Sequence, residues 1–390
     1  MTHRLYYTDA YLEAFTATVI AVDQDTRSVY LDRSAFYPTS GGQPHDLGTL
    51  GAASVVNVID ENDRVAHVLA SVETITVGQS IEGRVDWPRR FDFMQQHTGQ
   101  HLLSALCGDD FGWPTLSVHF GADYCTVDVA APQIDATALR GIEQHANAII
   151  TQNRKVSVSF EEAGAAQGLR KPSDRAGQLR IIAIEGIDRS GCGGTHVRRL
   201  GEIGSMLVRR VEKMKGATRI EFVCGARSVA RARADADLLA RAARTLSAAP
   251  EELPALVESQ LQRVGELERE RKRLVVDLAR CEALALWKDA PVDANGIRRL
   301  RIILNNKPVR DAEPLAQALS ALGTCIVLVL GDTPPGIMLA AAADSGLDAG
   351  SVLKSALAAV GGRGGGSPRM AQGSVPHTEA LRSVAESLGF

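Results

Sequence analysis

The chain has 390 residues, of which 45% are hydrophobic and 23% are charged. This length gives room for two or three domains with a sizeable core, and the ordinary composition indicates a globular protein. The formal net charge is −3, which excludes nucleic-acid binding through the overall field, so an RNA partner would need local basic patches.

Cysteine usage and hydropathy indicate a cytoplasmic protein. The six cysteines are spread through a large chain that shows no secretory segment and no dense disulfide-like spacing, which fits a reducing compartment. No apolar stretch approaches the length that crosses a bilayer, so we expect no membrane association.

The first predicted domain covers residues 1–86 and is rich in β-strands. From Phe15 to about Asp86, short β-rich runs alternate with turn residues, which predicts a small β-barrel or curled sheet. Between two of these strands lies a segment with Gly41 and Gly42, whose missing side chains permit a backbone course barred to larger residues. On its own this segment is typical of an ordinary surface turn.

The second predicted domain, residues 87–228, begins with a helix that carries two histidines. Pro88 suits a first helical turn, and apolar residues recur after it at near-helical spacing. His97 and His101 are four residues apart, so they share one face of this helix and can reach one ion.

A second pair of metal-ligand residues lies almost a hundred positions later. Cys192 and His196 are also four residues apart, in a glycine-rich stretch that predicts a tight loop. A histidine pair is often only hydrogen-bonded and a lone thiol often behaves as a small hydrophobe, but two such pairs together favour a Zn²⁺ site. Four protein ligands would also suit a closed, purely structural site.

The remainder of this domain is predicted to mix strands and helices. A basic hairpin from Ile203 to Phe222 follows the loop, and its charge is typical of either a solvated face or a surface that grips phosphates. The cations that we consider for RNA contact are Arg209, Arg210, Lys213 and Lys215.

The last two predicted segments are a helical arm at 229–290 and an α/β domain at 291–390. In the arm, apolar residues recur every three or four positions amid Glu and Arg, which predicts an amphipathic helix or coiled coil that packs within the chain or on a second subunit. The final domain contains a glycine-rich stretch that is typical of a flexible linker or of a phosphate-contacting loop. The candidate contacts in it are Arg363, Gly364, Gly365, Gly366 and Arg369.

Three motifs give the chain a family resemblance. Residues 85–104, residues 192–197 and residues 36–44 closely resemble the corresponding parts of the alanyl-tRNA editing proteins, the AlaX family. The glycine-rich stretch and residues 370–373 resemble the C-terminal domain shared by alanyl-tRNA synthetase and DHH-family phosphoesterases, which indicates the long form of AlaX. The expected fold class is therefore α+β: a β-barrel, a zinc-containing editing domain, a helical arm and a C-terminal α/β domain.

The resemblance implies a free-standing hydrolase that removes serine, or glycine, from mischarged tRNA specific for alanine. By this analogy the zinc ligands are His97, His101, Cys192 and His196. The analogy also implies that the substrate is contacted by Gly41, Gly42, Gln43, Thr115 and Ser117. We assign no catalytic residue beyond the metal ligands, although His119 is a candidate general base.

In an alternative hypothesis the chain binds zinc but does not catalyse hydrolysis. In it the chain is a tRNA-binding module with a purely structural zinc site, and its helical arm or C-terminal domain forms a homodimer. Metal-dependent release of serine from seryl-tRNA separates the two hypotheses, because a binding module would hold the RNA without turnover.

Overall fold

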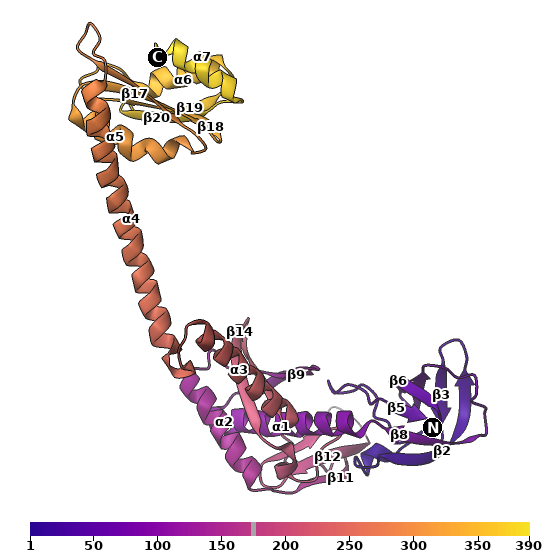
Figure 1. The fold of residues 1–390 in the computed structure, drawn as a ribbon. Helices are drawn as coiled ribbons and strands as arrows, with labels where there is room; N and C mark the ends of the chain where they lie inside the picture. Colours follow the sequence, from indigo (N-terminus) through magenta and orange to yellow (C-terminus); the bar gives the residue numbers. More distant parts are fainter. Residues whose placement is uncertain (173–176) are drawn as a thin grey trace. The chain divides into compact units, whose positions relative to one another are not determined.

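The computed structural model describes residues 1–172 and 177–390, which form a mixed α+β protein (Figure 1). The chain divides into two compact units, Met1–Ala242 and Ala243–Phe390. The division into four domains therefore stays a prediction. Among the described residues, no helix is both long and apolar enough to span a membrane.

The N-terminal part of the first unit contains the expected small barrel. Six strands close it in the order β2-β3-β7-β6-β5-β8, and their inward side chains fill its core. Their bounds are β2 (Ala14–Asp23), β3 (Ser28–Leu31), β5 (Gly48–Leu50), β6 (Ala53–Glu61), β7 (Arg64–Leu69) and β8 (Ser80–Val85). A short strand β1 (His3–Arg4) pairs in parallel with β4 (Arg33–Ser34), and the 3-10 turn η1 (Leu5–Tyr7) follows β1.

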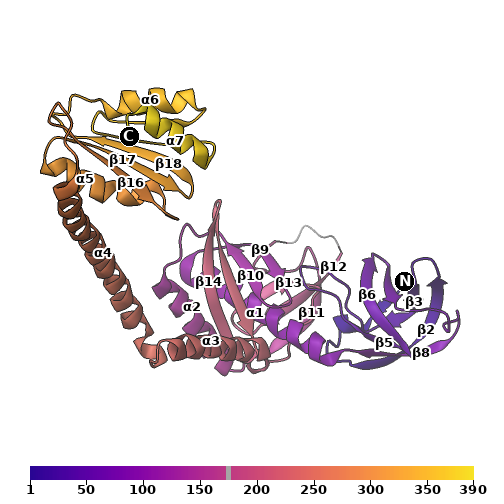
Figure 2. The ribbon, with the colours of Figure 1, turned by 45° about the horizontal axis from the view of Figure 1, so that its top comes forward.

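Helix α1 (Trp87–Phe111) is the central element of the first unit. Asp86 caps it by accepting a hydrogen bond from the backbone N–H of Arg89 at 3.2 Å, and Pro88 occupies the first turn as predicted. The helix contacts a four-stranded sheet with the order β14-β15-β10-β9 (Figure 2). The bounds here are β9 (Thr115–Phe120), β10 (Cys125–Val129), α2 (Ala136–Thr151), β14 (Met206–Met214) and β15 (Ala217–Cys224).

A second, three-stranded antiparallel sheet completes the first unit and leads into the Cys192 loop. Its order is β11-β12-β13, with β12 in the middle. The bounds are β11 (Val156–Glu162), β12 (Gln178–Ile184), β13 (Asp188–Gly191), the 3-10 turn η2 (Leu200–Ile203) and helix α3 (Ala226–Thr245).

The second unit starts with the predicted arm and ends in a five-stranded sheet. The arm is α4 (Leu253–Asp289), a helix of 37 residues. The sheet has the order β16-β17-β18-β20-β19, in which only the β16–β17 pair is parallel. The bounds are η3 (Pro250–Glu252), β16 (Arg298–Leu304), η4 (Val309–Ala312), α5 (Glu313–Leu322), β17 (Cys325–Asp332), β18 (Pro335–Ala341), α6 (Ala349–Ala359), β19 (Arg363–Gly366), β20 (Met370–Ser374) and α7 (Thr378–Ser387).

The middle of the glycine-rich stretch of the second unit is a strand and not a flexible linker. Its residues Arg363–Gly366 form strand β19, which pairs antiparallel with β20. A Cβ atom on Gly364 would lie 2.5 Å from the carbonyl oxygen of Gln372 and 2.6 Å from a methyl of Leu357. Glycine is therefore required here because backbone and α6 approach too closely for a side chain.

Candidate metal centre and substrate pocket

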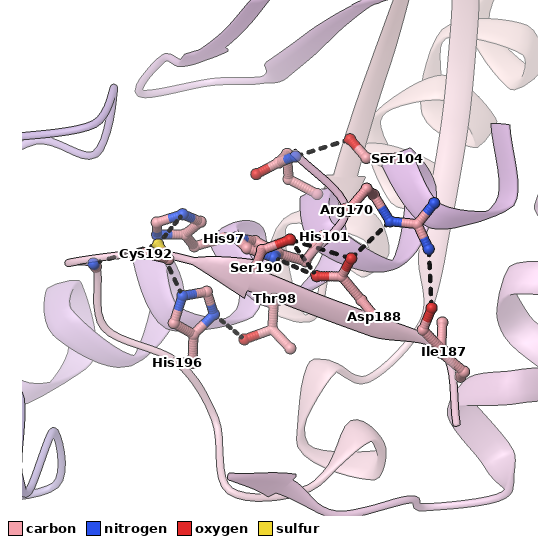
Figure 3. Close-up of polar contacts among 12 residues, drawn as sticks. His97, Thr98, His101, Ser104, Arg170, Ile187, Asp188, Ser190, Cys192 and His196 are labelled. Atoms are coloured by element: carbon pink, nitrogen blue, oxygen red, sulfur yellow. Dashed lines mark hydrogen bonds and ion pairs between the residues drawn. The ribbon is translucent and has the colours of Figure 1, made fainter. Parts of the chain in front are cut away.

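Four side chains from two distant segments converge in the first unit. His97 and His101 project from one face of α1, and Cys192 and His196 come from the loop after β13; one ligand atom from each lies within 4.8 Å of all the others (Figure 3). The Cys192 sulfur lies 3.5 Å from Nε2 of His97 and 3.4 Å from Nε2 of His196. Zinc bonds of about 2.3 Å to sulfur and 2.0–2.1 Å to nitrogen place tetrahedral donors about 3.5 Å apart, so the geometry fits this ion.

Gln43 fixes the orientation of the first imidazole. Its Oε1 accepts hydrogen bonds from Nδ1 of His97 at 2.8 Å and from the backbone N–H of Thr195 at 3.1 Å, while its Nε2 donates to Oγ1 of Thr195 at 2.7 Å. These bonds leave Nε2 of His97 unprotonated and turned toward the sulfur. Gln43 is fully buried and does not line the pocket, so the expectation that it contacts substrate is wrong.

The other two imidazoles are oriented in the same way. Nδ1 of His101 donates to Asp188 at 2.8 Å, and Nδ1 of His196 donates to Oγ1 of Thr98 at 3.2 Å. Thr98 can accept because its own hydroxyl proton goes to the carbonyl of Met94. All three histidines therefore present Nε2 to the same point, which is the arrangement that metal-ligating histidines adopt.

The glycines of the loop let it close onto the helix. A Cβ on Gly194 would lie 2.2 Å from a ring carbon of His97 and 3.0 Å from Oε1 of Gln43. The backbone N–H of Gly194 also donates to the Cys192 sulfur at 3.3 Å. Any larger residue at this position would push the loop away from α1 and separate the four donors.

The electrostatics of the cluster favour a thiolate at Cys192 and a neutral imidazole at His196. Burial would raise the pKa of Cys192, but His97, His196 and His101 lower it well below the usual value. Burial and the neighbouring His97 lower the pKa of His196 to about 3. For His101, burial acts to lower the pKa, but the hydrogen bonds and charges of Asp188 and Cys192 together outweigh it and raise the pKa to about 9.

A pocket of 840 Å³ lies over this cluster, within the first unit. One wall is the α1 face with the spacing His97, Gln100, His101 and Ser104. The sequence-predicted residues Gly41 and Thr115 also line it, but Gly42 and Ser117 do not. Other residues on its wall are Tyr6, Tyr7, Tyr37, Ser40, Phe160, Lys171, Arg180 and Cys192.

Sequence reasoning missed a small polar network on this wall. Ser104 Oγ accepts hydrogen bonds from Gln100 Nε2 and from Thr115 Oγ1, both at 2.8 Å. Gln100 and Ser104 each lie three residues after one of the two histidines and therefore on the same face of α1. This spacing in the sequence could have predicted that they line the pocket. Ser117 instead donates to Asp128 at 2.6 Å, outside the pocket.

The pocket wall offers no free carboxylate among the described residues. Asp60 is paired with Arg4 at 2.6 Å, and Arg170 pairs with both Asp188 at 2.6 Å and Asp109 at 2.8 Å. The sequence candidate His119 lines a separate hollow of 270 Å³ and not the pocket over the metal cluster.

The predicted basic hairpin is largely neutralised by its own sheet. Arg209 and Arg210 both pair with Glu221, whose side chain is 4% exposed. Lys213 and Lys215, by contrast, are exposed and have no ion pair in the described part of the chain. The first pair is therefore less suited to RNA contact than the second.

The arginines of the glycine-rich stretch are differently placed. Arg363 and Arg369 are exposed, and the described residues offer neither of them a carboxylate partner. Arg369 lies in the β19–β20 turn and Arg363 at the start of β19, opposite Ser374, and both stay candidates for phosphate contact although Gly364–Gly366 belong to a strand.

Comparison with known proteins gives three family-model matches. The model of class II (A) tRNA synthetases matches residues 8–89, that of the threonyl and alanyl tRNA synthetase second additional domain matches residues 179–221, and the DHHA1 domain model matches residues 308–388. The chain is thus a protein built of tRNA-synthetase-related domains.

Curated relatives refine this class. The alanine–tRNA ligase of Pyrococcus abyssi is 29% identical over 99% of this chain and 43% of its own length, and that of Pyrobaculum calidifontis is 33% identical over 95% and 42%. The alanyl-tRNA editing protein Aarsd1 of Rattus norvegicus is 32% identical over 56% of this chain and 58% of its own length. The chain spans less than half the length of these ligases. Over the matched segments the chain is similar to alanine–tRNA ligases and to alanyl-tRNA editing proteins, as the AlaX-like motifs in its sequence predicted.

Proposed function

We propose that this chain is a zinc-dependent hydrolase that deacylates tRNA specific for alanine when it carries serine, with glycine as the alternative wrong amino acid. The observation that carries the proposal is the convergence of three inward-facing Nε2 atoms and one thiolate at the floor of a pocket. The names of the relatives, alanine–tRNA ligase and alanyl-tRNA editing protein, support the substrate class.

Preference for serine would come from the polar network beside the metal ligands. Ser104 accepts two hydrogen bonds, so its own hydroxyl proton stays available for donation. The Nε2 of Gln100 donates one of these bonds, and its Oε1 has no protein partner in the described residues. A serine hydroxyl both donates and accepts, so it can satisfy both groups. Alanine would leave them unpaired at about 1–3 kcal/mol for each buried group, which protects the correct product.

A separate pocket that prefers serine is needed because amino-acid recognition by an alanine pocket is not selective enough. A pocket built for a small apolar side chain rejects an added hydroxyl only about 100-fold, so correction requires a second, polar pocket.

The four ligands His97, His101, Cys192 and His196 would hold the metal in this proposal. Bound zinc would supply Lewis-acid polarisation of an ester carbonyl or a lowered pKa for water. The carboxylates of the pocket wall are ion-paired, so the chain's own contribution is to bind and orient the ester and to restrict water.

One observation favours the alternative of a structural zinc. Four protein donors surround one point, and a tetrahedral ion held by all four has no open position for substrate. In that case the chain would bind tRNA and dimerise without hydrolysis.

Partner contacts complete the proposal. Lys213, Lys215, Arg363 and Arg369 are exposed cations that would contact RNA phosphates. Exposed apolar residues on α4, among them Leu261 and Leu274, would pair two chains in a homodimer through the arm, and the C-terminal domain is the other candidate interface. We place the protein in the cytoplasm.

The direct test is deacylation by the full chain. The tRNA specific for alanine should lose its amino acid when it carries serine and keep it when it carries alanine. A chelator should stop the release of serine, and added Zn²⁺ should restore it. Ser104→Ala should keep the metal but lower the ratio of the serine-release rate to the alanine-release rate, because the network loses its central hydroxyl. Tight RNA binding without turnover would favour the structural alternative.

A further inference from the structure

Phe160 on strand β11 is an exposed aromatic residue at the substrate pocket. It is 40% exposed, it lines the pocket, and no aromatic ring lies against it among the described residues. In the register of the β11–β12 pair, Phe160 lies directly opposite Arg180. Opposite residues in an antiparallel pair have Cβ atoms about 4.5–5.5 Å apart on the same face, so the two side chains are neighbours on one wall.

Arg180 is a buried cation without a carboxylate partner in the described part of the chain. It is 9% exposed, and its Nε donates to the carbonyl of Tyr7 at 2.9 Å. Its Nη1 donates to the carbonyls of Cys192 and Gly194 at 2.7 and 2.9 Å. Among residues 1–172 and 177–390, no acceptor is hydrogen-bonded to Nη2, so this nitrogen retains its donors for a ligand.

Tyr7 continues the same wall toward the metal loop. The guanidinium of Arg180 lies 5.5 Å from the centre of its ring. A Cβ on Gly193 would lie 3.7 Å from the Tyr7 hydroxyl, so this hydroxyl borders the loop that carries Cys192. Phe160, Arg180 and Tyr7 therefore form a row from an exposed ring to the metal ligands.

This row has the chemistry of a nucleotide site. Exposed aromatic rings bind unpaired bases by stacking, and arginine donors bind the sugar–phosphate backbone. An amino acid alone would need neither group, whereas an amino acid esterified to RNA brings a terminal ribose, base and phosphate into the pocket with it. The exposed Lys171 on the same pocket wall adds a cation that has no carboxylate partner in the described residues.

We propose that Phe160 stacks the terminal base of the unpaired 3′ end of RNA, with Arg180 facing its sugar–phosphate and the ester held at the metal end of the row. This site rests on the proposed function and names how its substrate is positioned. Phe160 is then a positioning residue that makes no contact with the reacting atoms.

Val158 supplies a matched control on the same strand. It is two residues from Phe160, so both side chains lie on one face of β11, and it is also 40% exposed, but it does not line the pocket. Isolated exposed apolar residues are common and carry no binding role. A general effect of trimming this strand would therefore appear in both variants.

The test measures binding of an uncharged RNA hairpin whose unpaired 3′ end terminates in 2-aminopurine in place of adenine. Fluorescence of the terminal base reports stacking, and anisotropy of a 5′ label reports affinity. For the full chain, Phe160→Ala should remove the change in base fluorescence and weaken binding about 5- to 150-fold, the range for loss of one base–aromatic stack. Phe160→Trp should retain both signals, and Val158→Ala should match the wild type.

A second RNA that lacks the terminal nucleotide isolates the stack. The wild type and Phe160→Ala should bind this shortened RNA equally. If Phe160→Ala leaves affinity and base fluorescence unchanged with the complete RNA, the stacking site is overturned. The RNA in this test carries no amino acid, so binding is measured independently of hydrolysis. If Phe160 stacks the base but the chain has no deacylase activity, the proposed function is wrong and the stacking site stands.

Discussion

The two glycine-rich segments of this chain, around Gly194 and around Gly364, have different structural surroundings. In the first unit, Gly194 lets the loop of Cys192 close on His97, and the buried side chains of His97 and Gln43 beside it are hydrogen-bonded to each other. In the second unit, Gly364 lets two strands pack under Leu357, and the neighbouring arginines remain exposed. The contrast is between side chains that converge on one point in the first unit and cations that stay exposed in the second.

The largest expected effect concerns the buried ion pair of Arg90 and Asp46, which joins α1 to the segment that carries Gln43. Both side chains are almost fully buried, at 0% and 2% exposed. Arg90→Met leaves a buried carboxylate unpaired and should lower the free energy of unfolding of the first unit by about 3–5 kcal/mol in urea titrations. The exposed pair Arg382–Glu386 of the second unit is the control, and Glu386→Gln should cost less than about 0.5 kcal/mol. Similar losses at the two pairs would contradict this contrast.

The next effect concerns the outer partners of the metal ligands. Asp188→Asn replaces the charged acceptor of His101 by a neutral amide, and Gln43→Met removes the acceptor of His97; each should weaken Zn²⁺ affinity about 10- to 100-fold. Competition with a chelator measures this affinity directly. Ser117→Ala, outside the pocket, should leave it unchanged. Unaltered affinity in both outer variants would mean that the hydrogen bonds do not tune the site.

The barrel should contribute a pH effect of its own through His67. Burial lowers the pKa of His67 to about 4, although its bond to the Val29 carbonyl acts to raise it. The unfolded state, with a histidine pKa of about 6.5, then binds more protons between these values, so stability falls as the pH drops below about 6.5. The loss from pH 7 to pH 5 should be about 2 kcal/mol. In urea titrations His67→Gln should remove that part of the pH dependence, and an equal dependence in this variant would contradict the assignment.

The smallest effect is expected at Arg363 and Arg369. If each contacts a phosphate, the double substitution to Gln should reduce the slope of log affinity for tRNA against log salt by about 0.7–0.9 per contact. Anisotropy titrations at several salt concentrations measure it. Arg382→Gln on α7 is a matched exposed control that should leave the slope unchanged. An unchanged slope in the double variant would remove these arginines from the RNA surface.

Local patterns in the sequence predicted much of the fold and half of the geometry of the site. Helical spacing correctly predicted that His97 and His101 share a face of α1, and alternation predicted the barrel strands. The outer partners Gln43 and Asp188 were not predictable as such, because each belongs to a segment that meets its histidine only through tertiary packing.

Long-range pairing also explains the errors. Composition predicted a loop or linker at residues 361–369, but close contact with β20 and Leu357 makes the glycines part of a strand. The basic hairpin stays a predicted cationic surface at Lys213 and Lys215, while strand register places Arg210 opposite Glu221, which also pairs with Arg209. Neither neighbour is visible from the spacing of residues within one segment.

The central claim is that two remote segments bind one ion that the hydrolysis requires. The most direct measurement is the metal content of the purified chain and of His101→Ala, made together with the rate of serine release from seryl-tRNA. The account predicts about one zinc per wild-type chain, and loss of both zinc and serine release in the variant. A metal-free variant that still releases serine at the wild-type rate would contradict it.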